Sequence, residues 1–324
     1  MKKYFALVLA LVMLLSLFAC GKKEEAAPSP TPESQQENPG GMAVHDDAIA
    51  AYDPEQDQHE TEETAETEET DAPAFAPVMI VDNAFFRAMA DSIEPHGSWG
   101  YTLNVTLENK SDHAVHVMLT EASLNDRMCD PAWSYDIEAK GIVSAQICWA
   151  EESLERVMLN PDNVTQIMAT MEVYWPDNGE AGNIVDETVC IYPKGSGAHQ
   201  GSFPDVPYQI SFFDNNEFVF AVTEFNPNAQ MGFALGVYIE NRTSETLYFT
   251  MDNVFVNGAA CDPYWITTVS GHMVALTDIG WYDAALQQAG ISSPSDVYEI
   301  SFDFSVYDGD GNYLVEAHPC CAAP

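Results

Sequence analysis

Residues 100–109 read Gly-Tyr-Thr-Leu-Asn-Val-Thr-Leu-Glu-Asn, and every second side chain from Tyr101 to Leu107 is apolar. The positions between them carry threonine or asparagine. Side chains of a β-strand point alternately to its two faces, so the pattern predicts a strand with one buried and one solvated face. Asn109-Lys110-Ser111-Asp112 then supplies a turn before residues 113–119 resume an extended pattern.

The same stretch recurs 132 residues later, because the chain contains an internal duplication. Residues 82–149 align without a gap on residues 214–281, and a single inserted residue then shifts the offset to 133. The matched pairs include Asp82–Asp214, Phe86–Phe218, Gly100–Gly232, Leu103–Leu235, Val105–Val237, Asn109–Asn241, Asn125–Asn257, Trp149–Trp281, Ile167–Ile300 and Val173–Val306. We therefore expect two homologous domains.

The expected boundaries follow from this alignment and from composition. A signal peptide covers 1–19, an acidic disordered tether 20–75, the first domain 76–195, a flexible Gly/Ser-containing linker 196–205, the second domain 206–318 and a C-terminal tail 319–324.

Each repeat reads as about seven short strands with turn signals roughly ten residues apart. One helical patch follows the matched tryptophan, over 151–159 in the first repeat and 282–289 in the second. The expected fold class is all-β, with two tandem immunoglobulin-like antiparallel β-sandwich domains that each carry one short helix. A Greek-key barrel is the main alternative.

The most distinctive duplicated motif is Cys-Asp-Pro-x-Trp. It comprises Cys129, Asp130, Pro131 and Trp133 in the first repeat and Cys261, Asp262, Pro263 and Trp265 in the second. We expect a structural role, in which the proline fixes a bend, the aspartate caps it and the tryptophan packs into the sandwich. The alternative is that the tryptophan is an exposed platform on which a sugar or peptide stacks.

The N-terminus predicts an extracytoplasmic address. Lys2 and Lys3 precede an apolar run over 4–19 that has the length of a signal-peptide core. The run ends in Leu-Phe-Ala-Cys-Gly at 17–21, which resembles a bacterial lipoprotein signal with Cys20 as the acylated residue. We expect lipidated Cys20 to anchor the protein to the cell membrane. An ordinary secretory signal with an incidental cysteine is the alternative.

The charge limits the classes of partner. The formal net charge is -40, and Arg242 is the only Lys or Arg after residue 195. An electrostatically driven nucleic-acid binder needs clusters of Lys and Arg, so we expect no nucleic-acid partner. Residues 20–74 are rich in Glu, Pro, Ser and Thr, which predicts a spacer that holds the domains away from the membrane.

Several stretches together resemble an uncharacterised bacterial repeat. They are Asp82-Asn83, Gly100-Tyr101-Thr102-Leu103, 107–111, Cys129-Asp130-Pro131 and the closing 187–193. The chain is thus similar to tandem-repeat surface lipoproteins of Gram-positive bacteria, a resemblance that covers both repeats. It implies an Ig-like fold, but it transfers no activity and no catalytic residue.

Motifs for catalysis and metal binding are mostly absent from the sequence. There is no Gly-x-Ser-x-Gly, His-Glu-x-x-His, phosphate-binding or dinucleotide-binding signature, so we expect no enzyme and no cofactor. Asp308, Asp310 and Asn312 have the opening alternation of a calcium loop, but Tyr313 stands where that loop needs glycine. We expect a polar hairpin turn there, with a weak calcium site as the alternative.

Six cysteines follow Cys20, and an extracytoplasmic address permits disulfides among them. Their pairing stays open: only Cys129 and Cys261 match between repeats, so a shared framework is improbable. The expected function is a non-enzymatic binding or structural module that meets a protein or glycan of the cell envelope. A calcium-dependent adhesive protein is the alternative.

Overall fold

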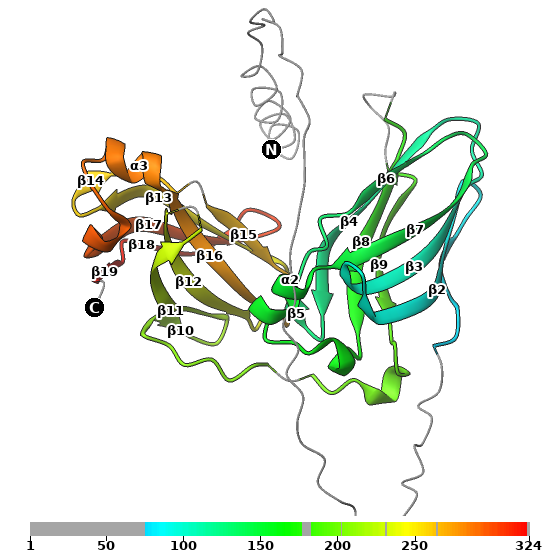
Figure 1. The fold of residues 1–324 in the computed structure, drawn as a ribbon, viewed down its shortest axis with the longest axis horizontal. Helices are drawn as coiled ribbons and strands as arrows, with labels where there is room; N and C mark the ends of the chain where they lie inside the picture. Colours follow the sequence, from blue (N-terminus) through cyan, green and yellow to red (C-terminus); the bar gives the residue numbers. More distant parts are fainter. Residues whose placement is uncertain (1–74, 177–182, 202, 231, 264, 323–324) are drawn as a thin grey trace, which may run out of the picture. The chain divides into compact units, whose positions relative to one another are not determined.

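The strand expected at 100–109 lies inside an antiparallel sheet of the structure, a computed structural model that describes residues 75–176, 183–201, 203–230, 232–263 and 265–322. Cys20, the signal segment and the tether up to residue 74 lie outside the described residues. The sheet has the order β1-β2-β3-β7 (Figure 1). Its strands are β1 (Val78–Asp82), β2 (Phe86–Gly97), β3 (Gly100–Asn109) and β7 (Ile142–Trp149).

A second sheet closes the other side of the first repeat. Its central strand β4 pairs antiparallel with β5, β6 and β8, and β9 pairs with β8. The two sheets enclose one hydrophobic cluster, into which the inward positions of β3 and β4 both project. The remaining elements are β4 (Val115–Leu124), β5 (Arg127–Met128), β6 (Ser134–Ile137), α2 (Glu151–Arg156), η1 (Pro161–Asn163), β8 (Ile167–Tyr174) and β9 (Val185–Ile191).

The second repeat has the same order of elements around a second cluster. One sheet runs β10-β11-β12-β16 and continues, through a one-residue parallel pairing of β16 with β5, into β4-β8-β9 of the first repeat. The other contains β13 paired with β14, β15 and β17, with β18 and β19 on β17. The elements are β10 (Ile210–Asp214), β11 (Phe218–Ala229), β12 (Gly232–Asn241), β13 (Leu247–Val256), β14 (Ala259–Ala260), β15 (Ile266–Val269), β16 (Val274–Tyr282), α3 (Asp283–Gln288), η3 (Pro294–Asp296), β17 (Glu299–Asp308), β18 (Tyr313–Ala317) and β19 (Cys320–Ala322). The all-β, sandwich-like character expected from the sequence is confirmed.

The duplication extends to irregularities of the backbone. The ladder of β2 and β3 shifts between Ala90 and Ser92, and that of β11 and β12 shifts at the matching place, between Val222 and Glu224. The β4–β8 and β13–β17 ladders likewise shift at matching positions. Because a β-bulge re-aims the side chains beyond it, both copies present the same positions inward.

The helices follow the expectation from the sequence. α2 starts two residues after Trp149 and α3 starts two residues after Trp281, and each buries one leucine. Among the described residues, no helix is long and apolar enough to cross a membrane.

Two expected boundaries differ in the structure. Residues 320–322 form β19 on β17 rather than a tail, and Cys321 is buried in the second core. Burying that thiol and completing the edge of β17 account for the extra strand. The expected linker 196–205 contains η2 (Ser196–Ala198), and His199 contacts Asp126 at 3.1 Å and Thr165 at 3.2 Å.

A buried asparagine joins the two sheets of each repeat. At the end of β3, Asn109 Nδ2 donates to the carbonyls of His113, Ile137 and Glu138 at 2.7–3.1 Å, while Oδ1 accepts from Ser111. The matched Asn241 donates to Glu245 and Val269 and accepts from Thr243. An amide supplies two donors and an acceptor, which suits a position where three chain segments end together.

We expect Asn109→Ala to lower the free energy of unfolding of the first repeat by about 3 kcal/mol or more, because several buried carbonyl and amide groups lose their partner together. Asn104→Ala removes an amide from the solvated face of the same strand and is the matched control, with an expected cost below about 0.5 kcal/mol. Urea unfolding of both variants measures the difference. Equal midpoints for the two variants would contradict the structural role of Asn109.

Candidate binding face

The repeated Cys-Asp-Pro-x-Trp motif lies directly after β5 and β14. The indole Nε1 of Trp149 donates to the carbonyl of Cys129 at 2.7 Å, and Trp281 donates to Cys261 at 2.8 Å. In the first copy Asp130 Oδ1 accepts from the backbone of Ala132 at 2.8 Å, which is the local cap expected from the sequence. The motif therefore holds the start of a turn against the C-terminal end of β7 or β16.

The motif tryptophans are less buried than expected. Trp133 and Trp265 are half-buried and pack against the edges of the two cores, whereas Trp149 and Trp281 are 0% and 1% exposed. Trp133 also stacks on Tyr135, with ring centroids 6.4 Å apart. Trp149 and Trp281, which lie on strands β7 and β16, are fully buried because their N–H groups reach a buried carbonyl.

The acidic loop at 308–312 is a hydrogen-bonded hairpin turn. Asp308 accepts from the backbone of Asp310 and from the backbone and side chain of Asn312, each at 2.9 Å. These bonds lower the pKa of the Asp308 carboxyl below its ordinary value. Within the described ranges no group of three or more His, Cys, Asp or Glu side chains could hold a metal ion. The weak calcium site stays a prediction.

The cysteines in the described part of the chain are all free. Burial raises the pKa of the Cys129 thiol to about 12, so it is uncharged at neutral pH. A thiol in that state packs as a small apolar group rather than acting as a nucleophile.

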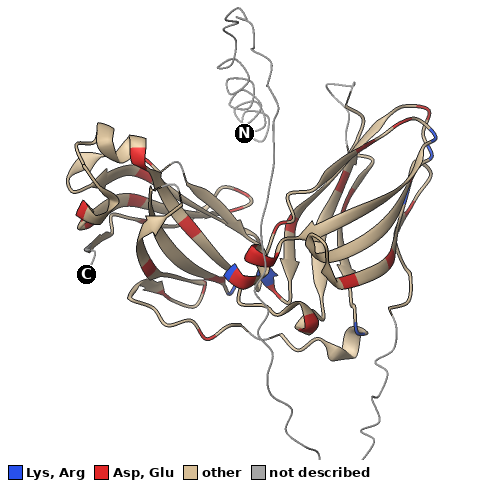
Figure 2. Cartoon of the chain, viewed as in Figure 1, with Lys and Arg blue, Asp and Glu red and all other residues tan. Residues whose placement is uncertain are grey.

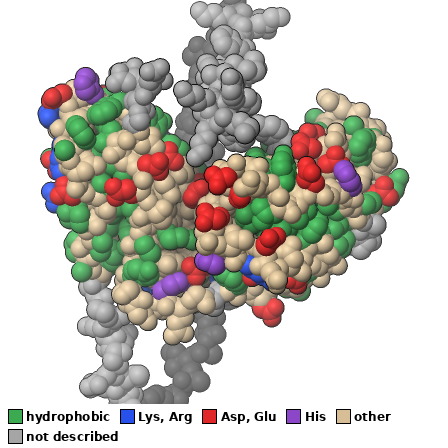
Figure 3. Space-filling model, turned by 180° about the vertical axis from the view of Figure 1, so that it is seen from behind, with side chains coloured by type: hydrophobic (Ala, Val, Ile, Leu, Met, Phe, Trp, Pro, Cys, Tyr) green, Lys and Arg blue, Asp and Glu red, His purple; other side chains and the backbone are tan. Residues whose placement is uncertain are grey.

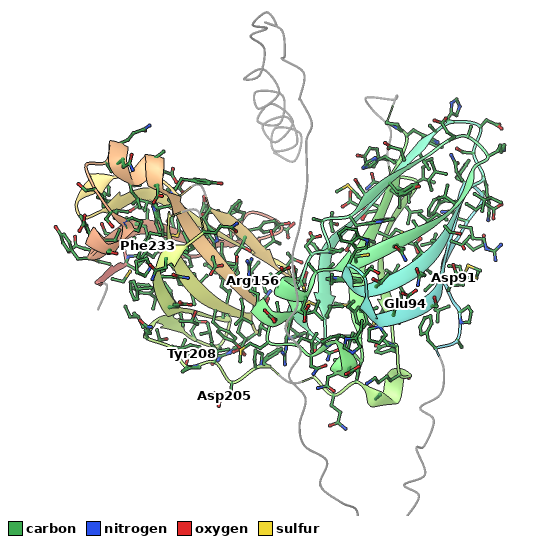
Figure 4. The ribbon with its side chains drawn as sticks, in the orientation of Figure 1. Asp91, Glu94, Arg156, Asp205, Tyr208 and Phe233 are labelled. Atoms are coloured by element: carbon green, nitrogen blue, oxygen red, sulfur yellow. The ribbon has the colours of Figure 1, made fainter. Side chains whose placement is uncertain are left out.

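The outer side of the sheet β1-β2-β3-β7 carries a polar surface that was not predicted from the sequence. Asn104 of β3 donates to Ser92 at 3.0 Å and to Glu94 at 2.8 Å, and Gln146 of β7 donates to Asn104 at 3.0 Å. Thr106 donates to Asp91 at 2.7 Å. We call this surface, formed by Asp91, Ser92, Glu94, Asn104, Thr106 and Gln146, the polar face; Figure 4 labels Asp91 and Glu94.

An exposed tryptophan lies at one end of the polar face. Trp99 stands in the turn between β2 and β3 and is 75% exposed, the largest exposed fraction among the big apolar side chains described. Glu94 and Thr102 pair across the ladder near this turn. The arrangement combines amides and carboxylates fixed by their neighbours with an indole open to solvent.

The second repeat reproduces the polar face only in part. Gly236 and Tyr238 match Asn104 and Thr106, so the central amide is missing, although the inward positions of the same strands stay apolar. The other four positions remain polar, as Thr223, Glu224, Asn226 and Asp278. Strand alternation had identified the outward side of β3 as solvated. The side chains of β2 and β7 that bond to Asn104 could not be predicted from the sequence of β3 alone. They depend on how the three strands align and on the bulge after Ala90.

Acidic side chains surround this face without forming one patch. Figure 2 shows Asp and Glu spread over both repeats with few Lys or Arg, and Figure 3 shows them dispersed among neutral and apolar side chains. Arg87, beside the polar face, lies 3.8 Å from Glu108. The surrounding field is negative, so it repels anionic partners.

No family model matches the sequence, and no curated protein matches it either. Among solved structures the chain is similar to the YadV chaperone, with 11% identity, a TM-score of 0.21 and coverage of 68% of this chain and 92% of that one. It is also similar to the Salmonella enterica SafA pilin in complex with the SafB chaperone (12% identity, TM-score 0.19, coverage 68% and 89%). A protein of unknown function from Porphyromonas gingivalis is similar at 13% identity and a TM-score of 0.17, with coverage of 67% of this chain and 90% of that one. At these TM-scores the similarities carry no argument about function.

Two of the four tryptophans of the first repeat, Trp133 and Trp149, should respond differently to truncation. We expect Trp149→Ala to cost about 3–5 kcal/mol, through a core cavity and an unpaired Cys129 carbonyl. Trp133→Ala should cost about half as much or less, since its ring is already partly solvated. Urea unfolding gives both values, and iodide quenching of single-tryptophan variants should reach Trp133 before Trp149. The reverse order would overturn the assignment.

Proposed function

We propose that the protein is a membrane-anchored surface lipoprotein that binds a glycan of the cell envelope without catalysis. In this proposal lipidated Cys20 holds the chain at the membrane, residues 20–75 act as a spacer, and two immunoglobulin-like domains are presented beyond it. The polar face of the first repeat is the binding surface. The observation that carries the proposal is the cross-strand array of Asn104, Gln146 and Glu94 beside exposed Trp99.

The division into two domains is supported by the separate cores. Each repeat has its own hydrophobic cluster, its own joining asparagine and its own tryptophan-to-carbonyl bond. A duplicated unit that closes its own core matches the usual anatomy of a domain. The order of its sheets around that core supports an Ig-like sandwich.

A glycan suits the chemistry of the polar face. Sugars present hydroxyl groups that both donate and accept, and side-chain amides and carboxylates meet both needs. An exposed indole adds a flat apolar surface with a polar edge. The net charge of -40 disfavours polyanionic polymers, so the proposed ligand is a neutral or amine-bearing polysaccharide.

The anchor is tested by Cys20→Ser in the full chain. The substitution removes the acceptor thiol but keeps the apolar segment, so we expect loss of acylation and of the cleaved, membrane-bound form. Metabolic labelling with a fatty-acid analogue, followed by fractionation, measures both. A cleaved, lipid-free Cys20→Ser protein that still sediments with membranes would show that something else holds it there.

The binding surface is tested by co-sedimentation of the protein with insoluble cell-wall polysaccharide and with chitosan, an amine-bearing glycan. We expect Trp99→Ala and Asn104→Ala each to weaken retention about tenfold, equivalent to about 1.4 kcal/mol. Tyr282→Ala removes another exposed aromatic, 57% exposed in the second repeat, and should leave retention unchanged. Equal retention of all three variants would place the ligand elsewhere.

A further inference from the structure

On the side away from Trp99, the same sheet carries an open hollow of about 210 Å³ that adjoins the polar face at Thr106. It is lined by Arg87, Met89, Thr106, Glu108 and Ile142, from β2, β3 and β7. The matching positions of the second repeat are Val219, Ala221, Tyr238, Glu240 and Val274. Four of these five form a buried cluster, so the surface that is open in the first repeat is covered in the second. Ile142 is 66% exposed, whereas the matching Val274 is 0% exposed.

The cover on the second repeat comes from the first repeat and from residues 206–208, which precede β10. The backbone N–H of Val274 donates to the carbonyl of Asp126 at 3.0 Å, and Val274 pairs in parallel with Arg127 of β5. Val206 packs on the buried cluster, and the ring of Tyr208, labelled in Figure 4, lies 5.4 Å from that of Tyr238. A β-turn of one repeat therefore caps the edge strand of the next.

The capping turn also exists, uncovered, in the second repeat. Asn125 and Asp126 both have positive φ, at 50° and 63°, and the matching Asn257 and Gly258 have 54° and 79°. Asn125 Oδ1 accepts from the backbone of Gln166, and Asn257 Oδ1 accepts from that of Glu299, so the same side-chain bond holds each turn. Gly258 is exposed, with open space around its Cα.

We propose that the joint between the repeats is reproduced between copies of this chain. The turn at 257–260 of one copy docks on the hollow of a second copy, with Ala259 beside Ile142 as Arg127 lies beside Val274. One end of the chain offers the turn and the other offers the hollow, so the contact is heterologous and extends head to tail.

Three observations favour a second copy as the occupant. The edge of β7 away from β3 has no strand partner among the described residues, whereas the same edge of β16 pairs with β5. The turn that fits such an edge is present in the chain itself. Arg87 replaces Val219 in the hollow and so offers a cation to a second repeat whose only Lys or Arg is Arg242.

The contact between copies should be weaker than the joint within one chain. Within the first repeat, Arg127 donates to the carbonyls of Val157 and Met158, which fixes the strand that meets Val274; the matching Ala259 has no such side chain. No linker holds the two copies together. Anchoring at a membrane would raise their effective concentration, which favours a weak head-to-tail contact.

Photo-crosslinking of the full chain in cells tests the proposal. With p-benzoylphenylalanine in place of Ile142, we expect a ladder of covalent multimers whose crosslinked peptide contains residues 257–260 of another copy. The matched control places the same residue at Ile266, which is 49% exposed on β15, and should give no ladder. Crosslinks from position 142 to another protein, to position 142 of a second copy, or to nothing would overturn the proposal.

A second variant tests the direction of docking. Ala259→Glu adds bulk and charge to the turn, and we expect it to reduce the ladder at least fivefold while the protein keeps its level and protease resistance. A copy that carries both the crosslinker at 142 and Ala259→Glu is then expressed with a tagged wild-type copy. We expect mixed dimers and no multimers larger than a dimer. An undiminished ladder would exclude docking through the turn. Glycan retention by the Trp99 and Asn104 variants reports on the other end of the sheet, so either proposal can fail alone.

Discussion

The buried asparagine at the end of the central strand is the contact on which each repeat depends. Asn109 is 1% exposed and Asn241 is 0% exposed, and each ties the end of one sheet to the turn that leads into the other. A buried amide is costly unless its groups are satisfied, so the turn must close in one geometry. The indole of Trp149 fixes the opposite end of the same sandwich through Cys129. Between these two contacts, alternating apolar side chains fill the core.

The two copies preserve these contacts and differ on their outer surfaces. The joining asparagine, the tryptophan-to-carbonyl bond and the bulges recur at matching positions. On the outer side of the first sheet, Asn104 of the first repeat is replaced by Gly236 in the second, and the open hollow is replaced by a buried apolar cluster. One copy of that surface is thus used to join the repeats, while the other is free to acquire a separate role in binding.

Sequence patterns predicted the framework better than the surfaces. Alternation over 100–109, the duplication and the helices after Trp149 and Trp281 follow from local periodicity, and the structure places them as expected. The alignment matched Asn109 with Asn241 but did not predict the groups that they bind. Their acceptors, the carbonyls of Ile137 and Val269, lie 28 residues further along the chain. Trp133 was expected in the core because a large aromatic side chain usually contributes most there, but it is half-buried at the edge of the core. Trp149 takes the deep position, where its indole donates to the buried carbonyl of Cys129. The strand at 320–322 has too few residues to show a period.

The negative charge of the chain limits random association of its exposed strand edges. A net charge of -40 opposes random association between copies, so only contacts with a defined geometry overcome it. The outer edge of β7 has no strand partner among the described residues, and an unpaired edge can attract another strand. A neighbouring turn with two positive-φ residues leads into β5, which pairs with β16 at one residue, so the ladder that joins the repeats is limited to that position. Tandem repeats that meet in this way keep a hydrophobic cluster each, although one sheet continues from the first repeat into the second.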